Sequence, residues 1–583
     1  MNSPLYTNIL IVGAGPAGLM LAVCLKRLGI DFKIIDKRIP GQLYGQADGI
    51  QPRTIELWES LGIAGELLNR GTRVCRSALF VPDEANKNVQ LIADGPNVAL
   101  PEARYPFEIL APVQLIEGIM RDTLTSQGVI IEQPMEPVSV RVIEKEKSPL
   151  IEIRLAPVVN QHGDTDIQEI HNTSETIITA KYVIGCDGAR SWVRKAMGIE
   201  MKGDETIFEW GVMDFTPVTN LPTFRAKTVI QSPLAPFIGY LPRPNRTARI
   251  YTLLGRTGSN IIMKSEEGAE TSDLIVKATK VGFLPYTMEY QDISWASIYR
   301  VKQMIATQYS AQDCVFLVGD ACHVHSPLGG QGANVSMADA YNLGWKLAAV
   351  LKGQAEASLL KTYEDERRPI ALDLLSLDKE IFKCFDSELH FDGLALGGVY
   401  MGNAPFLSGL GITYNSSLIK SGNEDLAPGL KLGYRFPSAE ILRHCDWNAV
   451  HTHDLIQYDG NFKLILLPGD IQNPEVESAL IELLFEMDNS ELRGHLKVLR
   501  DFKTIFRVPR TASLPAFGHS SWLYENCYVD ENEAQELHGI YALADVSPYK
   551  GVAVLVRPDG YVCTLMPIST ETVSLTKAYF DTL

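Results

Sequence analysis

The sequence predicts an α/β protein of several domains: a Rossmann-type nucleotide-binding unit, a mainly antiparallel sheet and a second α/β unit. Three observations lead to this prediction. A glycine-rich turn follows an apolar strand near the N-terminus, alternating strand patterns fill residues 205–310, and from residue 433 onwards apolar strands bracket helical patterns. A chain of 583 residues is also too long for one hydrophobic core.

The composition is that of an ordinary globular chain and argues against one class of partner. Hydrophobic residues make up 46% of the sequence and charged residues 21%. The formal net charge of −17 argues against a nucleic-acid partner, because binding to phosphates needs a basic surface. The nine cysteines are dispersed and form no CxxC pair, which is typical of reduced thiols. We therefore expect a cytoplasmic protein.

The run from residue 8 to residue 25 carries no charge and is long enough to raise the alternative of a membrane span. Glycines and a proline interrupt its middle, where a spanning helix would gain nothing from them. The first basic residue, Lys26, also follows the run, whereas a signal peptide or anchor begins with basic residues. We therefore expect no membrane partner.

The first unit begins with an apolar strand, residues 8–12, which suits a parallel strand buried on both faces. The sequence GAGPAG, residues 13–18, follows at once, and a helical pattern then runs to about Gly29. A second strand, residues 31–37, contains the acid Asp36. A GxGxxG turn between a strand and a helix, with an acid about twenty residues further on, predicts a dinucleotide site.

Each residue of this pattern has a physical role. Gly13 makes the tight turn, Gly15 lets the backbone approach a pyrophosphate, and Gly18 lets the helix pack on the strand. Asp36 accepts hydrogen bonds from a ribose, and the helix N-terminus faces the phosphates. The alternative is an ordinary glycine-rich turn. The pattern does not distinguish FAD from NAD(P).

Two later stretches of the sequence narrow the choice between FAD and NAD(P). Residues 181–199, KYVIGCDGARSWVRKAMGI, form a strand, an Asp-Gly pair and a basic helix. Residues 313–353 form a strand, a Gly-Asp pair, a glycine-rich loop and a long helix. Together with GAGPAG, these stretches resemble the three flavin motifs of the class A, single-component flavoprotein aromatic hydroxylases. The branch most similar is the phenol 2-monooxygenase and 3-hydroxybenzoate 4-monooxygenase type.

The resemblance covers nearly the whole chain. It includes the stretches GQADGIQPRTIELWESLGI (45–63), PVQLIE (112–117), KTYEDERRPIA (361–371) and GVAVLVRPDGY (551–561). It implies the p-hydroxybenzoate hydroxylase fold, non-covalent FAD, NAD(P)H as a transient co-substrate, and O2. The implied reaction hydroxylates a phenolic substrate ortho or para to its hydroxyl through a flavin C4a-hydroperoxide.

The resemblance also implies the residues that contact FAD. Asp320 would hydrogen-bond the ribityl chain, and the helix that begins in residues 329–334 would point its positive end at the isoalloxazine, favouring the reduced flavin. The full set is Gly13, Gly15, Pro16, Ala17, Gly18, Asp36, Lys37, Arg38, Gly45, Gln46, Ala47, Asp48, Gly49, Ile50, Gln114, Asp187, Tyr251, Asp320, Pro327, Gly330, Gln331, Gly332, Ala333 and Asn334.

Cys322, His323 and His325 raise the alternative of a zinc site in the same loop. A structural zinc ion needs a fourth ligand, and no second Cys/His cluster is within reach by sequence. We therefore expect no metal, and expect the two histidines to satisfy nearby backbone groups.

The stretch LPRPNRTARIYTLLG, residues 241–255, resembles the part of the family that carries an active-site arginine and tyrosine, which implies catalytic roles for Arg243 and Tyr251. Arg249 occupies a further matching basic position, and Asp48 is the third catalytic residue implied. Asp48 would take or hold the phenol proton, while Arg243 and Tyr251 orient the oxygen. The alternatives are a turn residue for Asp48, a surface arginine for Arg243 and simple sheet packing for Tyr251.

The chain departs from the family at two places near the expected flavin or its entry path. Many relatives carry a Gly-Gln-Arg-like turn where this chain has Val301, Lys302 and Gln303. The phenol branch often has a lysine where this chain has Leu328. Both departures bear on the identity of the aromatic substrate and on the choice between NADH and NADPH.

The C-terminal unit resembles a thioredoxin-like domain that lacks the CxxC pair, with Cys445, Cys527 and Cys563 isolated. The resemblance implies a structural role, often at a homodimer contact. We expect a discontinuous FAD-binding domain, a substrate domain, a linker and this unit, with these bounds: 1–80, 111–200 and 311–391; 81–110 and 201–310; 392–429; and 430–583.

Three other functions are weighed against aromatic hydroxylation. The same fold could perform Baeyer–Villiger or epoxidation chemistry on an aromatic polyketide, or inactivate an aromatic drug. A non-catalytic flavin-binding scaffold would need none of Asp48, Arg243 and Tyr251. A reductase with two Rossmann units would need a second GxGxxG, and none occurs.

Overall fold

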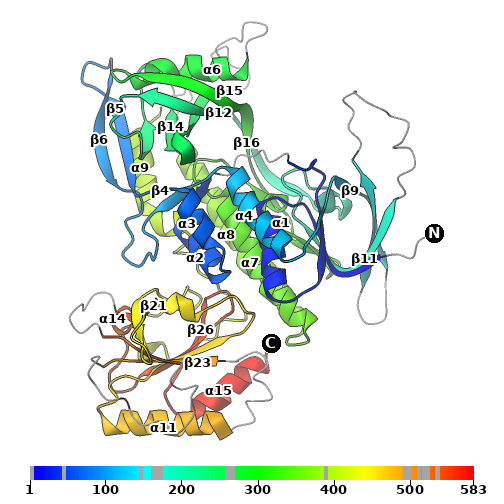
Figure 1. The fold of residues 1–583 in the computed structure, drawn as a ribbon, viewed down its shortest axis with the longest axis vertical. Helices are drawn as coiled ribbons and strands as arrows, with labels where there is room; N and C mark the ends of the chain where they lie inside the picture. The colour runs from blue at the N-terminus through cyan, green and yellow to red at the C-terminus, as the bar shows by residue number, and fades with distance from the viewer. Residues whose placement is uncertain are drawn as a thin grey trace.

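The computed structural model describes residues 5–41, 48–143, 149–158, 175–235, 237–256, 270–385, 391–489, 501–508, 514, 526–531 and 539–583. Figure 1 shows three bodies: a central α/β body, an antiparallel sheet above it, and a C-terminal α/β unit below it. The prediction of this fold class is confirmed.

The central body is built on a mixed sheet whose main path is parallel. Strand β1 (Leu5–Val12) lies between β11 (Thr176–Gly185) and β2 (Phe32–Ile35), and it is parallel to both. The path is completed by β8 (Ile131–Glu132), β18 (Val315–Leu317) and β17 (Ser310–Ala311), while β9 (Met135–Ile143) and β10 (Leu150–Pro157) form an antiparallel extension. Because β1, β11 and β18 are parallel, the carboxyl ends of β1 and β18 lie at the same edge of the sheet, where the loops that follow them meet.

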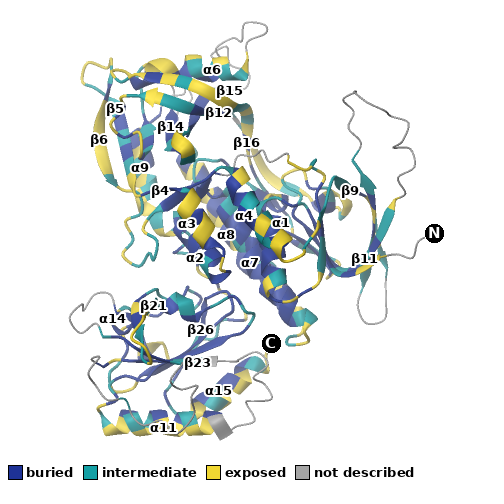
Figure 2. Ribbon diagram, viewed as in Figure 1, coloured by how far each residue is buried: buried dark blue, intermediate teal, exposed yellow. Residues whose placement is uncertain are grey.

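Long helices cover this sheet. Helix α1 (Pro16–Arg27) packs against α7 (Gly332–Leu351), and α8 (Lys361–Phe382) packs against α7. The first strand and α1 account for the uncharged run at residues 8–25, which is apolar because both are buried (Figure 2). In the described part of the chain, no helix is long and apolar enough to cross a membrane. The other helices here are α2 (Pro52–Ser60), α3 (Ala64–Arg70), α4 (Val113–Ser126) and α5 (Trp192–Ala196).

The upper sheet is dominated by two long antiparallel strands, β12 (Met201–Thr219) and β16 (Met288–Ala306). The order continues from β12 through β15 (Ala248–Arg256), β14 (Ile238–Pro242) and β13 (Lys227–Ile230) to β5 (Arg76–Pro82) and β6 (Val89–Pro96), and β19 (His323–Val324) pairs with β16. Strand β5 enters this sheet at Arg76, before the expected boundary at residue 81, so we propose that the substrate domain begins at Arg76.

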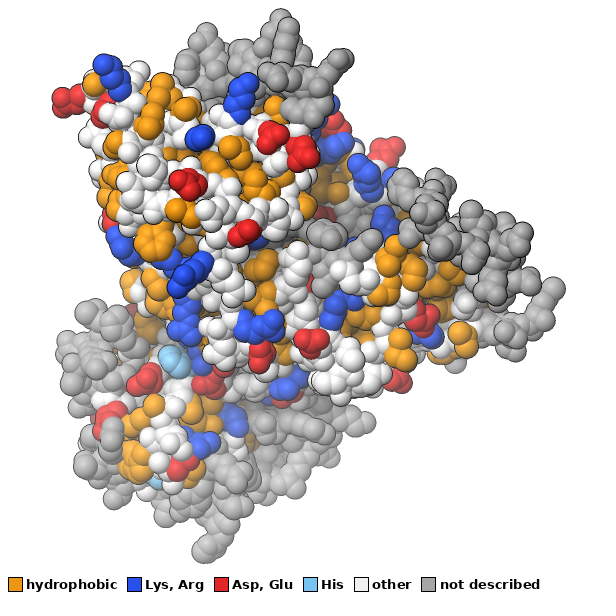
Figure 3. All heavy atoms as spheres, turned by 45° about the horizontal axis from the view of Figure 1, so that its top comes forward, with side chains coloured by type: hydrophobic (Ala, Val, Ile, Leu, Met, Phe, Trp, Pro, Cys, Tyr) orange, Lys and Arg blue, Asp and Glu red, His pale blue; other side chains and the backbone are white. Residues whose placement is uncertain are grey.

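Smaller elements connect these bodies. Strands β3 (Gly49–Ile50), β7 (Glu108–Leu110) and β4 (Thr72–Val74) form a small sheet, and α6 (Thr271–Thr279) packs on the upper sheet. The segment expected to be a linker, 392–429, contains two helices, α9 (Gly393–Gly402) and α10 (Ala404–Leu407), and α9 lies beside β5. Figure 3 shows basic and acidic side chains interspersed among apolar ones on the described part of one face, rather than gathered into a basic stripe.

The C-terminal unit contains a seven-stranded mixed sheet. Within it, β22 (Lys463–Leu467) is parallel to β23 (Asp501–Phe506) and antiparallel to β25 (Val552–Val556). The remaining elements are β20 (Glu440–Arg443), β21 (Ala449–His451), β24 (Cys527–Val529), β26 (Val562–Met566), α11 (Pro474–Asn489), α14 (Ile540–Ala544) and α15 (Glu571–Phe580). Burial raises the pKa of both Cys527 and Cys563 to about 12, so neither thiol is prepared for redox chemistry.

A buried charge cluster joins this unit to the central body. Glu366 of α8 accepts hydrogen bonds from both terminal nitrogens of Arg557, at 2.5 and 2.9 Å, and from Lys346 of α7 at 2.7 Å. Arg557 also pairs with Asp559 in the turn between β25 and β26. All four side chains are at most 2% exposed. The C-terminal unit is therefore anchored to the same two helices that extend toward the glycine-rich loop.

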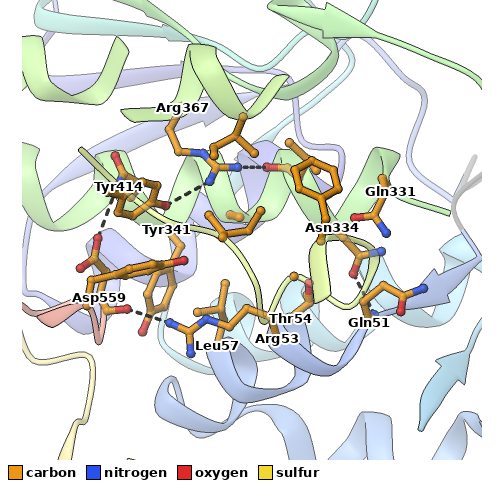
Figure 4. Close-up of a pocket in the computed structure, with 18 residues that line it drawn as sticks. Gln51, Arg53, Thr54, Leu57, Gln331, Asn334, Tyr341, Arg367, Tyr414 and Asp559 are labelled. Carbon is orange, nitrogen blue, oxygen red and sulfur yellow. Dashed lines mark hydrogen bonds between the residues drawn. The ribbon is translucent and has the colours of Figure 1, made fainter. Parts of the chain in front are cut away.

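A cavity of about 40 Å³ lies at this junction. Figure 4 shows the side chains that line it. Arg367 donates a hydrogen bond to the Tyr414 hydroxyl at 3.0 Å, and Arg53 donates to the Asp559 carbonyl at 2.9 Å. Of the predicted site residues, the cavity is lined by Gln331 and Asn334. The other predicted site residues that the structure describes lie outside its lining.

Candidate active site

The glycine-rich turn after β1 has the geometry that its sequence predicts. Gly13 has a φ of +104°, and a Cβ there would lie 2.4 Å from the carbonyl oxygen of Cys186. A Cβ on Gly18 would lie 1.9 Å from the Gly13 carbonyl oxygen, so α1 packs on the turn only because both residues are glycine. A Cβ on Gly15 would meet no atom within 4 Å, so the backbone is open there to a pyrophosphate. The turn fits a dinucleotide.

Asp36 lies at the end of β2, where the sequence predicted a ribose contact. Its carboxylate accepts hydrogen bonds from the Ala14 N–H at 2.6 Å and from the Arg38 N–H at 2.7 Å. Burial raises the pKa of Asp36, but hydrogen bonds and the charge of Arg38 outweigh burial and leave the pKa below its usual value. The sequence reasoning missed Glu117 and Arg121, which extend this cluster: Arg38 pairs with Glu117, and Arg121 donates to the Ala14 carbonyl.

The loop that carries Asp48 is tied to the glycine-rich loop before α7. The Asn334 side chain accepts from the Gln51 N–H at 2.9 Å and donates to the carbonyls of Gly49 and Gly330, each at 2.8 Å. Figure 4 shows Asn334 pointing toward Gln51. Two loops almost three hundred residues apart are therefore held together by one amide. The predicted contacts at positions 45–47 (Gly45, Gln46 and Ala47) lie outside the described residues.

The Gly-Asp motif places Asp320 in a short helical turn, Gly319–Ala321, beside the two histidines. His325 bonds through Nδ1 to the Ser326 carbonyl at 2.8 Å, as expected. His323 differs from the prediction: its Nε2 lies 2.8 Å from the Asp339 carboxylate, so its partner is an acid and not the backbone. Within the described ranges, no group of three His, Cys, Asp or Glu side chains is arranged to hold a metal ion.

The other predicted FAD contacts take positions around these loops. The Asp187 carboxylate caps α5, since it accepts from the backbone N–H groups of Trp192 at 2.6 Å and Val193 at 3.1 Å. Gln114 lies in the first turn of α4, and Lys37 is exposed beside Asp36. Gln331 donates to the Leu407 carbonyl at 2.6 Å, which joins the loop to α10.

The three predicted catalytic residues meet beneath the upper sheet. Asp48 Oδ1 accepts a hydrogen bond from Arg243 Nε at 2.6 Å, although the two residues are 195 positions apart in the chain. Arg243 is 3% exposed and Asp48 7% exposed. The alternative of a surface arginine for Arg243 is therefore wrong, while the alternative of a turn residue for Asp48 stays open. Tyr251 is also buried, and its hydroxyl oxygen accepts from Arg249 Nη1 at 3.3 Å.

An acid that the sequence reasoning missed completes the cluster. Asp214 of β12 accepts from Arg243 Nη1 at 2.7 Å and from Arg249 Nε at 2.6 Å and Nη2 at 2.8 Å. Arg243 thus uses two of its nitrogens, Nε and Nη1, on carboxylates, and its third, Nη2, makes no hydrogen bond to the described residues. A signal was present, because Asp214 is an acid within the apolar strand GVMDF.

Two polar atoms of this cluster are buried and have no hydrogen-bond partner among the described residues: Asp48 Oδ2 and Arg243 Nη2. Buried polar atoms are almost always bonded, so such atoms in a native site indicate a ligand or bound water. Burial raises the pKa of Asp48 above its usual value, against the opposing charges of Arg243 and Arg249. The cluster therefore has a carboxylate that binds a proton more readily than an ordinary aspartate.

The open glycine-rich turn, the joined loops and the buried Asp48–Arg243 pair fit an FAD-binding monooxygenase of the aromatic hydroxylase class. A model of the FAD binding domain matches residues 6–378, and a model of the phenol hydroxylase C-terminal dimerisation domain matches residues 412–583. The chain belongs to this FAD-dependent aromatic hydroxylase family, and it is an enzyme that binds FAD. NAD(P)H and O2 are the typical co-substrates of the class.

Two relatives match this chain over nearly their full length. The chain is 31% identical to the FAD-dependent monooxygenase terD of Aspergillus terreus, covering 97% of this chain and 94% of that protein. It is 30% identical to the 3-hydroxybenzoate 4-monooxygenase of Comamonas testosteroni, with 99% and 95% covered. A crystal structure of aklavinone-11 hydroxylase with FAD and aklavinone shares the fold at a TM-score of 0.70 and 22% identity, with all of both chains covered.

We predict that Asp320→Ala loses FAD, because the family resemblance gives this carboxylate the ribityl contact. The purified variant should show at least a tenfold weaker FAD affinity, since a hydrogen bond to a charged group contributes about 1.5–3 kcal/mol. Flavin absorbance after gel filtration measures the occupancy. Asp313→Asn, an exposed acid before β18, is the control. Full occupancy in Asp320→Ala would show that the assignment of this loop is wrong.

Proposed function

We propose that the protein uses NAD(P)H and O2 to hydroxylate a phenolic substrate ortho or para to its hydroxyl group, with Asp48 as the proton acceptor. The observation that carries the proposal is the buried carboxylate of Asp48, which bonds Arg243 through one oxygen and has no hydrogen-bond partner for the other among the described residues. A phenol hydroxyl bonded to that oxygen would enter a site that already contains two guanidinium groups.

Bound FAD supplies the reduction and activation of O2. The chain's own residues prepare the aromatic ring. When Asp48 accepts the phenol proton at Oδ2, the ring becomes a phenolate, which is more nucleophilic at its ortho and para carbons. Arg243 and Arg249 lie next to this carboxylate, at 2.6 and 3.8 Å, and stabilise the negative charge that moves onto the phenol oxygen. Burial keeps water away from these charges and strengthens their interaction.

The proposed cofactor contacts are those of the sequence analysis, and three features support them. The turn at Gly15 is open, Asp36 is anchored at the end of β2, and Asn334 joins the two loops that would flank the isoalloxazine. We also propose a homodimer, which the match to a dimerisation domain supports.

A panel of substrates tests the proposal. The FAD-loaded enzyme is mixed with phenols, hydroxybenzoates and polyketide phenols, and NAD(P)H oxidation and product are measured together. We expect phenols to stimulate oxidation and to gain one oxygen next to or opposite the hydroxyl. Products with oxygen inserted beside a carbonyl would identify Baeyer–Villiger chemistry instead. A lack of stimulation by every compound would overturn the proposal.

We predict that Asp214→Asn shifts the pH profile of hydroxylation to lower pH, by roughly one pH unit. The negative charge of Asp214 raises the pKa of Asp48, so its removal leaves Arg243 and Arg249 to favour the ionised carboxylate. Asp48 acts only when deprotonated, so a lower pKa extends activity toward acid. Product formed per NAD(P)H consumed, measured against pH, checks this. Asp204→Asn, an exposed acid on the same strand, should leave the profile in place. A shift to higher pH would contradict the prediction.

A further inference from the structure

The charged cluster lies at one end of a face of the upper sheet, and the other end of the same face is aromatic. Side chains alternate along a strand, so Trp210, Val212 and Asp214 of β12 share one face. Across the sheet, Asp214 is opposite Arg249 of β15, and Trp210 is opposite Tyr299 of β16. Asp214 lies four positions after Trp210 on the strand, which places their Cα atoms about 13 Å apart. One face therefore has a charged end and an aromatic end.

The aromatic end is built around Trp210. Its ring lies 5.5 Å from that of Phe237 and 5.7 Å from that of Phe385, both in edge-to-face geometry. Phe382 of α8 lies 6.4 Å from Trp210. These rings pack against one another in a buried apolar cluster.

Two polar atoms remain unpaired within this apolar surface. The indole Nε1 of Trp210 and the hydroxyl oxygen of Tyr299 are both buried, and neither has a hydrogen-bond partner in the ranges that the structure describes. Trp210 is fully buried, and the two residues lie directly opposite each other on neighbouring strands. Leaving such groups unpaired in the working enzyme would cost about 1–3 kcal/mol for each one.

The chemistry of the two atoms defines what would pair with them. An indole N–H only donates, and a tyrosine hydroxyl can donate as well. A carbonyl oxygen has two lone pairs and can accept from both. At the charged end, Asp48 Oδ2 accepts while Arg243 Nη2 donates, which suits a phenol hydroxyl. One ligand that satisfies both ends carries a phenol at one end and a carbonyl at the other.

We propose that Trp210 and Tyr299 are specificity-determining residues that bind a carbonyl oxygen at the far end of the substrate. The substrate class is then an extended aryl ketone with a phenolic hydroxyl, longer than one ring. This inference rests on the proposed function, because it takes Asp48 as the phenol end of the site.

A pair of biphenyls tests the inference. 4-Acetyl-4′-hydroxybiphenyl has a carbonyl two rings away from its hydroxyl, and 4-ethyl-4′-hydroxybiphenyl has a methylene there. Their Kd values for the FAD-loaded enzyme are read from the change in flavin absorbance, and their KM values from NAD(P)H oxidation. In the wild type we expect the ketone to bind about tenfold more tightly, the difference that one or two neutral hydrogen bonds produce.

Tyr299→Phe removes the hydroxyl and keeps the ring, so the ketone preference should fall about three- to tenfold. Binding of phenol itself should not change. Thr252→Val is the matched control, because Thr252 also has a buried, unpaired hydroxyl, but its position between Tyr251 and Leu253 puts it on the opposite face of β15. This variant should keep the wild-type preference.

The outcomes separate the two proposals. If phenol is hydroxylated but the wild type binds the two biphenyls equally, or binds neither, the carbonyl subsite is overturned and the proposed function stands. An unchanged ketone preference in Tyr299→Phe also overturns the subsite. If no phenol, biphenyl or simple, stimulates NAD(P)H oxidation, the proposed function fails and the subsite fails with it.

Discussion

Asp48→Asn should lower hydroxylation by ~10²–10⁴, the usual contribution of a positioned general base. The amide preserves the shape of the side chain and can still bond Arg243 through its oxygen, but it cannot take the phenol proton. FAD binding should survive, because the backbone carbonyl of Asp48 bonds the Ala111 N–H regardless of the side chain. NAD(P)H oxidation should continue with release of hydrogen peroxide. Product per NAD(P)H consumed measures the effect.

The pH dependence distinguishes Asp48 from its neighbours. Burial raises the pKa of Asp48, so coupling in the wild type should fall as the pH drops toward that raised value and the base becomes protonated. In Asp48→Asn, a higher pH should partly restore product by ionising the phenol in solution. Arg243→Met and Tyr251→Phe should weaken substrate binding or coupling without that rescue. Coupling at the wild-type level in Asp48→Asn would remove this residue from the mechanism.

Glu366→Gln should destabilise the protein by about 3–5 kcal/mol, the effect of removing one partner from a buried ion pair. The substitution leaves Lys346 and Arg557, both fully buried, with Asp559 as the remaining acid of the cluster. The substitution removes a negative charge, because Arg557 and Lys346 outweigh the effect of burial and hold the pKa of Glu366 far below its usual value. The Tm should fall by roughly 10 °C.

The unfolding of this chain is expected to involve more than one step, since it contains several domains. The Tm is therefore measured both by circular dichroism and by the fluorescence of the FAD that is released on unfolding. Glu380→Gln changes an exposed acid on the same helix and should leave both signals within a degree or two of the wild type. A wild-type Tm in Glu366→Gln would show that the cluster does not hold the C-terminal unit in place.

The local sequence pattern was sufficient to predict much of the fold. The apolar strand, the GAGPAG turn and the acid after β2 are separated by few residues, so their spacing alone specifies the geometry that brings Asp36 to the Ala14 N–H. The alternation of polar and apolar residues likewise indicated the upper sheet, and the resemblance indicated a third unit. The sequence did not predict helices α9 and α10, because the glycine, serine and asparagine residues in that segment are typical of a loop.

The sequence by itself determined the class of protein, the flavin turn and the identity of Asp48, Arg243 and Tyr251 as candidates. The tertiary structure decided how they meet. Asp214 binds Arg243 and Arg249 across 29 and 35 positions, and Glu366 binds Arg557 across 191. Such partners depend on strand register and domain packing, which bring together side chains whose separation in sequence carries no period. For that reason the charged cluster, the Trp210–Tyr299 pair and the contacts of Arg243 became visible only in three dimensions.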